Sequence, residues 1–434
     1  MKELLEVREF DSIVCGSVRE NSSNCKPLDK VQFDELLKFI REFSSDEANS
    51  DALEFMRIGY KRNIGDFINI RNYVGLIQLR NGFQVQILPK IDFGKDDQDN
   101  SQTKKVFLKM LRSLKNFPCK AFNDANLKVD KMNLYEIFIN MYLQEVRQLV
   151  KRGIKSDYVT QEDNISHYKG KLLVNQHIQM NFAHKERFYV AFDEFHPNRP
   201  ENRLVKATLK KLLKLTASTE NSKEIRQLLS AFEMVESSVN YEKDFSKVII
   251  DRNTDDYKML MQWSKVFLMN KSFSTFSGSS NSSALLFPME RVYESYVAQH
   301  IKKIFTSDGW EVSTQDKGCY LFTEPKRFAL IPDIVLEKDK RTVIMDTKWK
   351  SLVDDESKNY GISQNDMYQM YAYSKKYKAK EVWLLYPMNE AMRNHSSISF
   401  ESDEKDEKTL VSLHFVEVDE IEKSLGELKN KLAH

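Results

Sequence analysis

The amino-acid sequence predicts a multidomain α+β protein with a β-rich N-terminal domain, a mainly helical middle region and a C-terminal α/β domain. Three observations predict this fold class. Apolar residues alternate with a period of two before about residue 104, and they recur every three or four residues from there to about residue 270. After residue 284, helix and strand patterns alternate. We therefore expect domains at residues 1–103, 104–283 and 284–434.

The composition limits the class of protein. The 434 residues include 66 Lys and Arg against 64 Asp and Glu, and a net charge of +2 excludes a strongly basic nucleic-acid coat protein. Because 41% of the residues are apolar, the chain can form packed cores and is not a disordered polyelectrolyte. No run of about 18 apolar residues occurs and the N-terminus does not resemble a signal peptide. We expect a soluble cytoplasmic protein without a membrane partner.

The cysteines and histidines do not predict a zinc site. Four cysteines lie far apart without a C-x-x-C pair, namely Cys15, Cys25, Cys119 and Cys319. This spacing favours reduced thiols over a disulfide framework. His177 and His184 lack a His, Cys or Asp partner three or four residues away, so we expect them in the core or at the surface.

The clearest element of the N-terminal part is a β-hairpin. Alternating apolar residues lie on both sides of Arg80-Asn81-Gly82: Val74, Ile77 and Leu79 before it, and Phe83, Val85 and Ile87 after it. Asn-Gly between two such runs predicts a type I′ turn, because both central residues of that turn need a positive φ. The polar run at 92–101 then predicts an exposed loop.

Two helices are predicted in the middle region. An apolar stripe runs from Leu134 to Val150 and ends at Gly153. A second helix at 203–215 turns apolar residues inward and its lysines outward, namely Lys206, Lys210, Lys211 and Lys214. These lysines could contact phosphates, but a solvated helix face is the more common arrangement. The serine-rich segment at 272–283 predicts a flexible loop or a domain boundary.

The C-terminal part begins with a predicted helix at 289–305. Strands are then expected at 328–336, 342–349 and 381–386, with another helix between the last two. If the polar residues 338–341 form a hairpin turn centred between Asp339 and Lys340, Asp333 lies opposite Asp346. Partners of this kind have Cβ atoms about 5 Å apart. Lys348 lies two residues beyond Asp346 and so projects from the same face.

Two carboxylates this close repel each other unless a cation or a proton lies between them. Oxygen ligands from aspartate suit Mg²⁺, so we expect a magnesium site formed by Asp333, Asp346 and the backbone carbonyl of Thr347. With Lys348 to orient a water or stabilise charge, this is the layout of a phosphodiester hydrolase.

The alternative interpretation is an exposed ion pair without function. The D-x-K pattern occurs four times, at Asp256, Asp346, Asp403 and Asp406, and is uninformative alone. Only Asp346 lies within an apolar β-run and has a Pro-Asp at the matching distance upstream. An acid buried at a strand end without a function is costly, so the catalytic interpretation is favoured.

This arrangement resembles the PD-(D/E)xK nuclease superfamily, with Pro332-Asp333 and Asp346-Thr347-Lys348 as the namesake residues. Glu294 matches the acid that the superfamily often carries on the helix before its core sheet. Gln369 and Tyr373, four residues apart on one helical face, resemble its Q-x-x-x-Y element. For each of these three residues the ordinary alternative is a surface or packing role.

The resemblance narrows to the McrC family, the nuclease subunits of modification-dependent restriction systems. The order and spacing of several short strings carry it: Arg71–Ile77, Ile87–Ile91, Leu149–Ile154, Lys169–Leu173, Phe192–Phe195 and Glu201–Leu204. The family implies a C-terminal domain that cuts double-stranded DNA carrying modified cytosine. It also implies an N-terminal part that docks on a McrB-like AAA+ GTPase ring and stimulates its GTP hydrolysis.

The sequence agrees with this division of labour. No G-x-x-x-x-G-K-[ST] motif occurs, since Gly170-Lys171 is followed by Leu172 and Ile165 replaces the first glycine. Any GTP must therefore be bound by the partner, and this chain has no nucleotide-binding residues of its own. We expect a Mg²⁺-dependent DNA endonuclease subunit of a GTP-dependent, methylcytosine-directed restriction complex.

Two alternatives remain open from the sequence. One is a catalytically silent regulatory or scaffold subunit of a GTPase ring, and the other is a stand-alone DNA-repair nuclease. Lys350 is equally consistent with a phosphate contact and with a solvent-exposed strand end.

Overall fold

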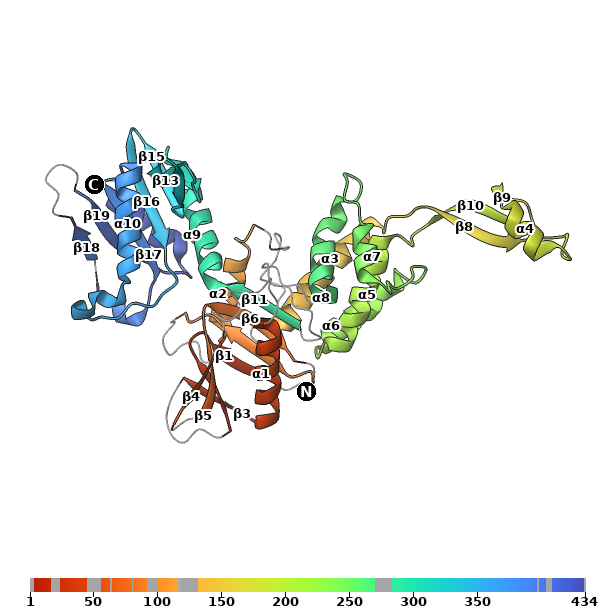
Figure 1. Cartoon of the computed structure of the whole chain (residues 1–434), viewed down its shortest axis with the longest axis horizontal. Coiled ribbons are helices and arrows are strands. Elements are labelled where there is room, and N and C mark those ends of the chain that lie inside the picture. Colours follow the sequence, from red (N-terminus) through yellow and green to blue (C-terminus); the bar gives the residue numbers. More distant parts are fainter. Residues whose placement is uncertain are drawn as a thin grey trace.

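The computed structural model describes residues 4–16, 24–44, 56–62, 65–79, 81–91, 100–115, 117, 132–269, 283–395, 398–402 and 408–432. The polar loop predicted at 92–101, up to residue 99, and the serine-rich segment up to residue 282 lie outside these residues. The described part is a mixed α+β structure, as the sequence predicts. In Figure 1, two N-terminal sheets lie below, a group of middle helices lies to one side, and the C-terminal sheet with its helices lies to the other.

The N-terminal part contains two four-stranded sheets. The first has the order β1 (Leu4–Arg8), β7 (Gln84–Leu88), β6 (Tyr73–Gln78) and β11 (Ser283–Pro288). The second has the order β3 (Cys25–Leu28), β2 (Ser12–Cys15), β5 (Gly65–Ile70) and β4 (Met56–Lys61), and α1 (Lys30–Ser44) lies beside it. The last strand of the first sheet, β11, comes from far along the chain, so the polypeptide returns to this sheet before it enters the C-terminal part.

The predicted hairpin between β6 and β7 is confirmed, but the predicted type I′ turn is wrong. The backbone N–H of Leu79 donates to the carbonyl of Phe83 over 2.9 Å, and the N–H of Gly82 donates to the carbonyl of Leu79 over 3.0 Å. Gly82 has a φ of +88°, whereas Asn81 is not among the residues with positive φ. The loop has three residues rather than two, so a single glycine in the left-handed region closes it.

Both helices predicted in the middle region are confirmed. α3 (Leu134–Arg152) begins where the Asn133 side chain accepts a hydrogen bond from the N–H of Glu136 over 2.9 Å, and it ends at Gly153. The other helix is α5 (Pro200–Leu215). The further helices nearby are α2 (Ser101–Leu111), α6 (Thr219–Ser230), α7 (Tyr241–Ser246) and α8 (Lys258–Met269).

A β-rich arm interrupts the middle helices, and the sequence did not predict it. The arm consists of β8 (Asp157–Ile165), β9 (Lys171–Leu172), α4 (Val174–Asn181) and β10 (Phe188–His196), and it extends away from the rest of the molecule (Figure 1). Most of its side chains are at least partly exposed, including Tyr158 at 70% and Phe182 at 85%. Val190 is buried, whereas the other side chains described in β8 and β10 are at least partly exposed. These strands therefore lack the apolar alternation that marks a half-buried strand.

The C-terminal part is built on a six-stranded mixed sheet. Its order is β12 (Glu311–Thr314), β15 (Ile334–Lys338), β16 (Arg341–Thr347), β17 (Glu381–Pro387), β19 (Leu410–Val416) and β18 (Ile398–Glu401). The accompanying helices are α9 (Met289–Thr306), α10 (Gln364–Tyr377) and α11 (Ile421–Leu432). β16, β17 and β19 are parallel, and their central residues are buried.

The hairpin that carries the predicted site has the expected register. Ile334 pairs with Met345 and Lys338 pairs with Arg341 in the antiparallel pairing of β15 with β16. Asp339 and Lys340 both have positive φ, which is the geometry of a type I′ turn. The strand predicted at 328–336 is in fact two strands. β14 (Lys326–Leu330) pairs with β13 (Cys319–Thr323), and the chain leaves that hairpin at 331–333 before β15 begins.

No helix among the described residues is both long and apolar enough to span a membrane. The described cysteines, Cys15, Cys25 and Cys319, are free thiols, and Cys119 lies outside the described residues.

Candidate active site

Asp333 and Asp346 meet at one end of the β15–β16 hairpin. The register of the hairpin places Asp333 opposite Asp346, one position beyond the last pair of the ladder. Asp333 is held by Thr347, whose backbone N–H and hydroxyl both donate to Asp333 Oδ2, over 2.7 and 2.6 Å. The sequence did not predict this role of the Thr347 side chain. It fixes the orientation of the Asp333 carboxylate relative to Asp346.

Lys348 projects toward the same acids. Its Nζ lies 2.6 Å from Asp346 Oδ2 and 3.8 Å from Asp366 Oδ1, and it donates to Gln369 Oε1 over 3.2 Å. The side chain of Asp346 is only 3% exposed and that of Lys348 is 18% exposed. The ammonium group is therefore held by two acids and an amide in a site with little solvent.

Gln369 and Tyr373 continue this network along α10. Gln369 Nε2 donates to the Tyr373 hydroxyl over 2.7 Å, and that hydroxyl donates to the carbonyl of Ile331 over 3.0 Å. The two residues lie on one face of the helix, as their spacing predicted. They contact Lys348 and the segment before Asp333, so they position the hairpin end relative to α10.

Asp366 also belongs to the site, although the sequence did not single it out. It is buried on α10 and accepts a hydrogen bond from Lys350 Nζ over 2.8 Å, in addition to its contact with Lys348. Its spacing of three residues before Gln369 and seven before Tyr373 places all three on one helical face. That spacing is the signal that could have found it.

Glu294 approaches the aspartates from α9. Its Oε1 accepts a hydrogen bond from Gln315 Nε2 over 2.6 Å, and the backbone N–H of Gln315 donates to the carbonyl of Asp333 over 2.9 Å. Burial, and then the negative charge of Asp333, raise the pKa of Glu294 to about 7. The structure thus brings together all the side chains that the sequence singled out for this site.

The charges in the site are unbalanced. Burial, and then the charge of Asp333, raise the pKa of Asp346 to about 7, and burial raises the pKa of Asp333. Burial alone lowers the pKa of Lys348, but the charges of the neighbouring acids and the hydrogen bond to Asp346 together outweigh burial, and the pKa is raised. Carboxylates that resist ionisation this strongly are stabilised by an added cation.

The metal ligands expected from the sequence are the carboxylates of Asp333 and Asp346 and the backbone carbonyl of Thr347. The described residues contain no group of three or more His, Cys, Asp or Glu side chains placed to hold one. The expected set contains only two carboxylates, so it is smaller than such a group. Oxygen donors of this kind, with their uncompensated charge, fit a hard cation that keeps several waters, and Mg²⁺ has this property.

The fold and the site together define the class of protein. It is a multidomain α+β protein with buried acids and a lysine at the end of a mixed sheet. A family model described as "McrBC 5-methylcytosine restriction system component" matches residues 68–387. This span is well over half of the chain. The chain therefore belongs to the McrBC 5-methylcytosine restriction system component family.

A solved structure supports the fold, and a second one is less similar. A chain of a half-complex from a tetradecameric assembly of Thermococcus gammatolerans McrB AAA+ hexamers with bound McrC has a TM-score of 0.69 and 20% sequence identity, covering 98% of this chain and 100% of that chain. The cryo-EM structure of the Thermococcus gammatolerans McrBC complex has a TM-score of 0.48 and 21% identity, covering 70% of this chain and 87% of that chain. A comparison with curated proteins finds no match.

Proposed function

We propose that this chain is the Mg²⁺-dependent DNA endonuclease subunit of a GTP-dependent, methylcytosine-directed restriction complex. The observation that carries the proposal is the placement of Asp333 and Asp346 at one buried sheet end, with the Lys348 ammonium 2.6 Å from Asp346 Oδ2. Membership of the 5-methylcytosine restriction family supports the choice of DNA with modified cytosine as the substrate.

The residues have distinct roles in this proposal. Asp333, Asp346 and the backbone carbonyl of Thr347 would hold Mg²⁺. The chemistry that Mg²⁺ supplies when bound is Lewis-acid polarisation of a phosphoryl oxygen. Lys348 orients the attacking water or stabilises the negative charge that develops on the phosphate. Its Nζ is held for this purpose by Asp346 and Gln369.

The surrounding residues act by positioning. The Tyr373 hydroxyl fixes the carbonyl of Ile331, two residues before Asp333, and Gln369 links Tyr373 to Lys348. Glu294 holds Gln315, which is bonded to the Asp333 backbone. Because both networks converge on Asp333 and Lys348, they keep the reacting groups within the narrow range of positions that catalysis needs.

The proposed partner is a McrB-like AAA+ GTPase ring in the cytoplasm, whose GTP hydrolysis this chain stimulates. The similar fold in a structure described as McrB AAA+ hexamers with bound McrC supports this choice. The sequence has no P-loop, so GTP is bound by the ring and not by this chain.

The test is cleavage of methylated and unmethylated plasmid with Mg²⁺, by this chain alone and with its GTPase partner and GTP. The variant is Asp346→Asn. Asp256→Asn is the matched control, because Asp256 belongs to another D-x-K sequence and forms an exposed ion pair with Arg152. We expect cleavage of methylated plasmid by the complete mixture, lost in Asp346→Asn and kept in Asp256→Asn.

The other outcomes distinguish the alternatives. Cleavage by the chain alone, without GTP or partner, would identify a stand-alone nuclease. GTPase stimulation without any cleavage that depends on Asp346 would identify a regulatory subunit with a silent nuclease fold. Either result would overturn the proposal.

A further inference from the structure

A groove with a volume of about 550 Å³ lies between the N-terminal and C-terminal parts of the chain. Its lining includes Arg71 and Lys90 from the N-terminal part, and Trp349 and Lys350 from the C-terminal part. Glu290 is the acid among the lining residues. Positive charge from two separate parts of the chain therefore collects in one concave surface.

The cationic groups of the N-terminal part are available to a ligand. Arg71 and Lys90 are both exposed, and neither forms an ion pair with a carboxylate of the described residues. Arg71 Nε donates to the Asn69 side chain over 3.1 Å, which orients the guanidinium and leaves its terminal nitrogens to bind elsewhere. Lys90 Nζ lies 5.9 Å from the centre of the Phe10 ring. A held guanidinium of this kind suits phosphate oxygens, which it can bind in pairs.

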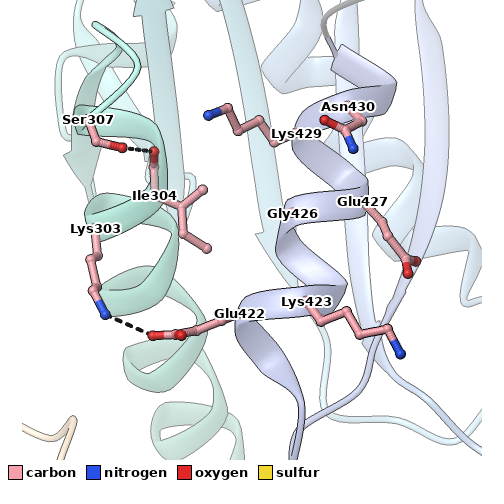
Figure 2. Close-up of a pocket in the computed structure, with 9 residues that line it drawn as sticks. All are labelled: Lys303, Ile304, Ser307, Glu422, Lys423, Gly426, Glu427, Lys429 and Asn430. Atoms are coloured by element: carbon pink, nitrogen blue, oxygen red, sulfur yellow. Dashed lines mark hydrogen bonds and ion pairs between the residues drawn. The ribbon is translucent and has the colours of Figure 1, made fainter.

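A second groove shows the opposite arrangement. It lies between α9 and α11, and Figure 2 shows its lysines along the facing helices. There, each lysine Nζ lies close to a carboxylate oxygen. The distances are 2.8 Å from Lys303 to Glu422 Oε1, 3.1 Å from Lys423 to Glu420 Oε2 and 2.9 Å from Lys429 to Asp308 Oδ1. Each of these lysines is paired with a carboxylate, so that groove offers no comparable site for an anion. In the groove of Arg71 and Lys90, by contrast, these two cations form no ion pair with a carboxylate in the part of the chain that the structure describes.

The groove of Arg71 and Lys90 is linked to the candidate active site through Lys350 and Asp366. Lys350 Nζ lies 2.8 Å from Asp366 Oδ2, and the other oxygen of Asp366 lies 3.8 Å from Lys348 Nζ. Between these lysines, Trp349 is buried and donates from its indole N–H to Glu9 Oε2 over 2.9 Å. This bond ties the N-terminal part to the strand end that carries Lys348. Both parts of the groove are therefore fixed relative to the site.

We infer that this groove binds the sugar–phosphate backbone of DNA next to the phosphate held at Lys348, with Arg71 and Lys90 each contacting a phosphate. The inference rests on the proposed function, because it assigns a position to the substrate of that site. It also accounts for substrate binding by a chain with a net charge of only +2, since the cations that matter are concentrated in one concave surface.

The test compares two double variants in an Asp346→Asn background that cannot cleave. Arg71→Ala/Lys90→Ala removes the groove cations. Lys61→Ala/Arg62→Ala is the matched control, because it removes one lysine and one arginine that are exposed on the same N-terminal part outside the groove. Binding of a short fluorescent DNA duplex to the full-length chain is measured by anisotropy over a range of salt concentrations.

We expect the groove variant to bind at least about tenfold more weakly than its parent, with a salt dependence reduced by about two released counterions. The control variant keeps both the affinity and the salt dependence of the parent. Arg71→Lys/Lys90→Arg, which keeps both charges, retains most of the salt dependence, and thermal unfolding verifies that all variants are folded.

Three results would overturn the inference. They are equal loss in both double variants, no loss in the groove variant, and no DNA binding by the parent chain. Unchanged DNA binding with weaker association to the GTPase ring would instead assign the groove to an acidic protein surface. None of these results affects the proposed nuclease activity, which is decided separately by cleavage that depends on Asp346.

Discussion

The contacts of Lys348 show how one side chain depends on its surroundings. Its ammonium lies between the carboxylates of Asp346 and Asp366 and the amide of Gln369. The acids raise its pKa, so it stays charged at neutral pH despite burial. A charged donor held in a site of low solvent content interacts strongly with negative charge that develops on a phosphate.

Replacing Lys348 by Met tests this role. Lys348→Met keeps a long unbranched side chain but removes the charge, and we expect cleavage to fall at least about 100-fold. Lys338→Met is the control, since Lys338 lies at the other end of β15 and donates to the Asp308 carbonyl over 2.7 Å. The measurement is the single-turnover cleavage rate in the complete mixture. A Lys348→Met rate close to that of the control would contradict the proposed role.

Glu9 gives a second prediction at the scale of one residue. It is 1% exposed, and burial raises its pKa from 4.5 to about 7. Because the folded state holds this proton more tightly than the unfolded state, the contribution to stability is full below pH 4.5 and is lost as pH rises to about 7. The loss is on the order of 3 kcal/mol.

Glu9→Gln removes this titration and keeps an oxygen that can accept the indole hydrogen bond of Trp349. We expect the free energy of unfolding of the wild type to fall by roughly 3 kcal/mol relative to the variant between about pH 5 and about pH 8. Asp34→Asn, which replaces an exposed acid on α1, serves as the control. Parallel pH profiles for the wild type and Glu9→Gln would show that Glu9 does not titrate in this range.

At the scale of elements, Gly75 determines whether β11 can pair with β6. Its φ is +135°, and a Cβ added there would lie 1.9 Å from the carbonyl oxygen of Leu285 on β11. Gly82 also has a positive φ, of +88°, but a Cβ there meets nothing within 4 Å. The two glycines share a strained conformation and differ in the space around them.

Alanine at these two positions separates strain from steric exclusion. Gly82→Ala introduces only the strain of the left-handed conformation, which lowers the free energy of unfolding by about 1–2 kcal/mol. Gly75→Ala introduces similar strain and also forces β11 away from β6. We therefore expect its free energy of unfolding to fall by at least about 2 kcal/mol more than that of Gly82→Ala. The free energy of unfolding in denaturant measures both. Equal losses would show that β11 can shift without cost.

The elements that the sequence predicted have a buried face, whereas the largely exposed arm was missed. The hairpin of Asp333 and Asp346 was predicted to the residue, because apolar runs on both sides of a polar turn leave one register that pairs them. The arm of β8 and β10 was missed because its strands are largely exposed. The turn at Gly82 was mistaken in type because Asn-Gly is compatible with more than one loop length.

The sequence did not predict several contacts at and around the site, and one of them connects distant parts of the chain. Glu9 and Trp349 are separated by 340 residues, and no periodicity in either segment indicates that they bond. Asp366 and the hydroxyl of Thr347 are closer to the predicted residues, yet their roles depend on how α10 packs on the sheet and on the rotation of one carboxylate. The pattern of residues along the chain indicates where elements end but not how these side chains are oriented.

At the scale of the whole molecule, the arm is an appendage. Its ends lie together, since Asp157 pairs with His196. We expect that replacing residues 158–195 by a short Gly-Ser turn leaves the remaining chain folded, with a melting temperature within about 4 °C of the wild type. Circular dichroism during heating measures this. A non-cooperative transition, or a larger fall, would show that the arm stabilises the helices beside it.

The position of β11 in the N-terminal sheet has a consequence for how the protein is made. The edge of β6 that β11 covers stays open on the ribosome until residue 288 has emerged, although β6 itself is complete at residue 78. At a synthesis rate of about 5–20 residues per second, this delay lasts on the order of ten to forty seconds. For that time an apolar strand edge is exposed to neighbouring chains, which can pair with it. We therefore expect this chain to aggregate more readily as a nascent chain on the ribosome than as the finished protein.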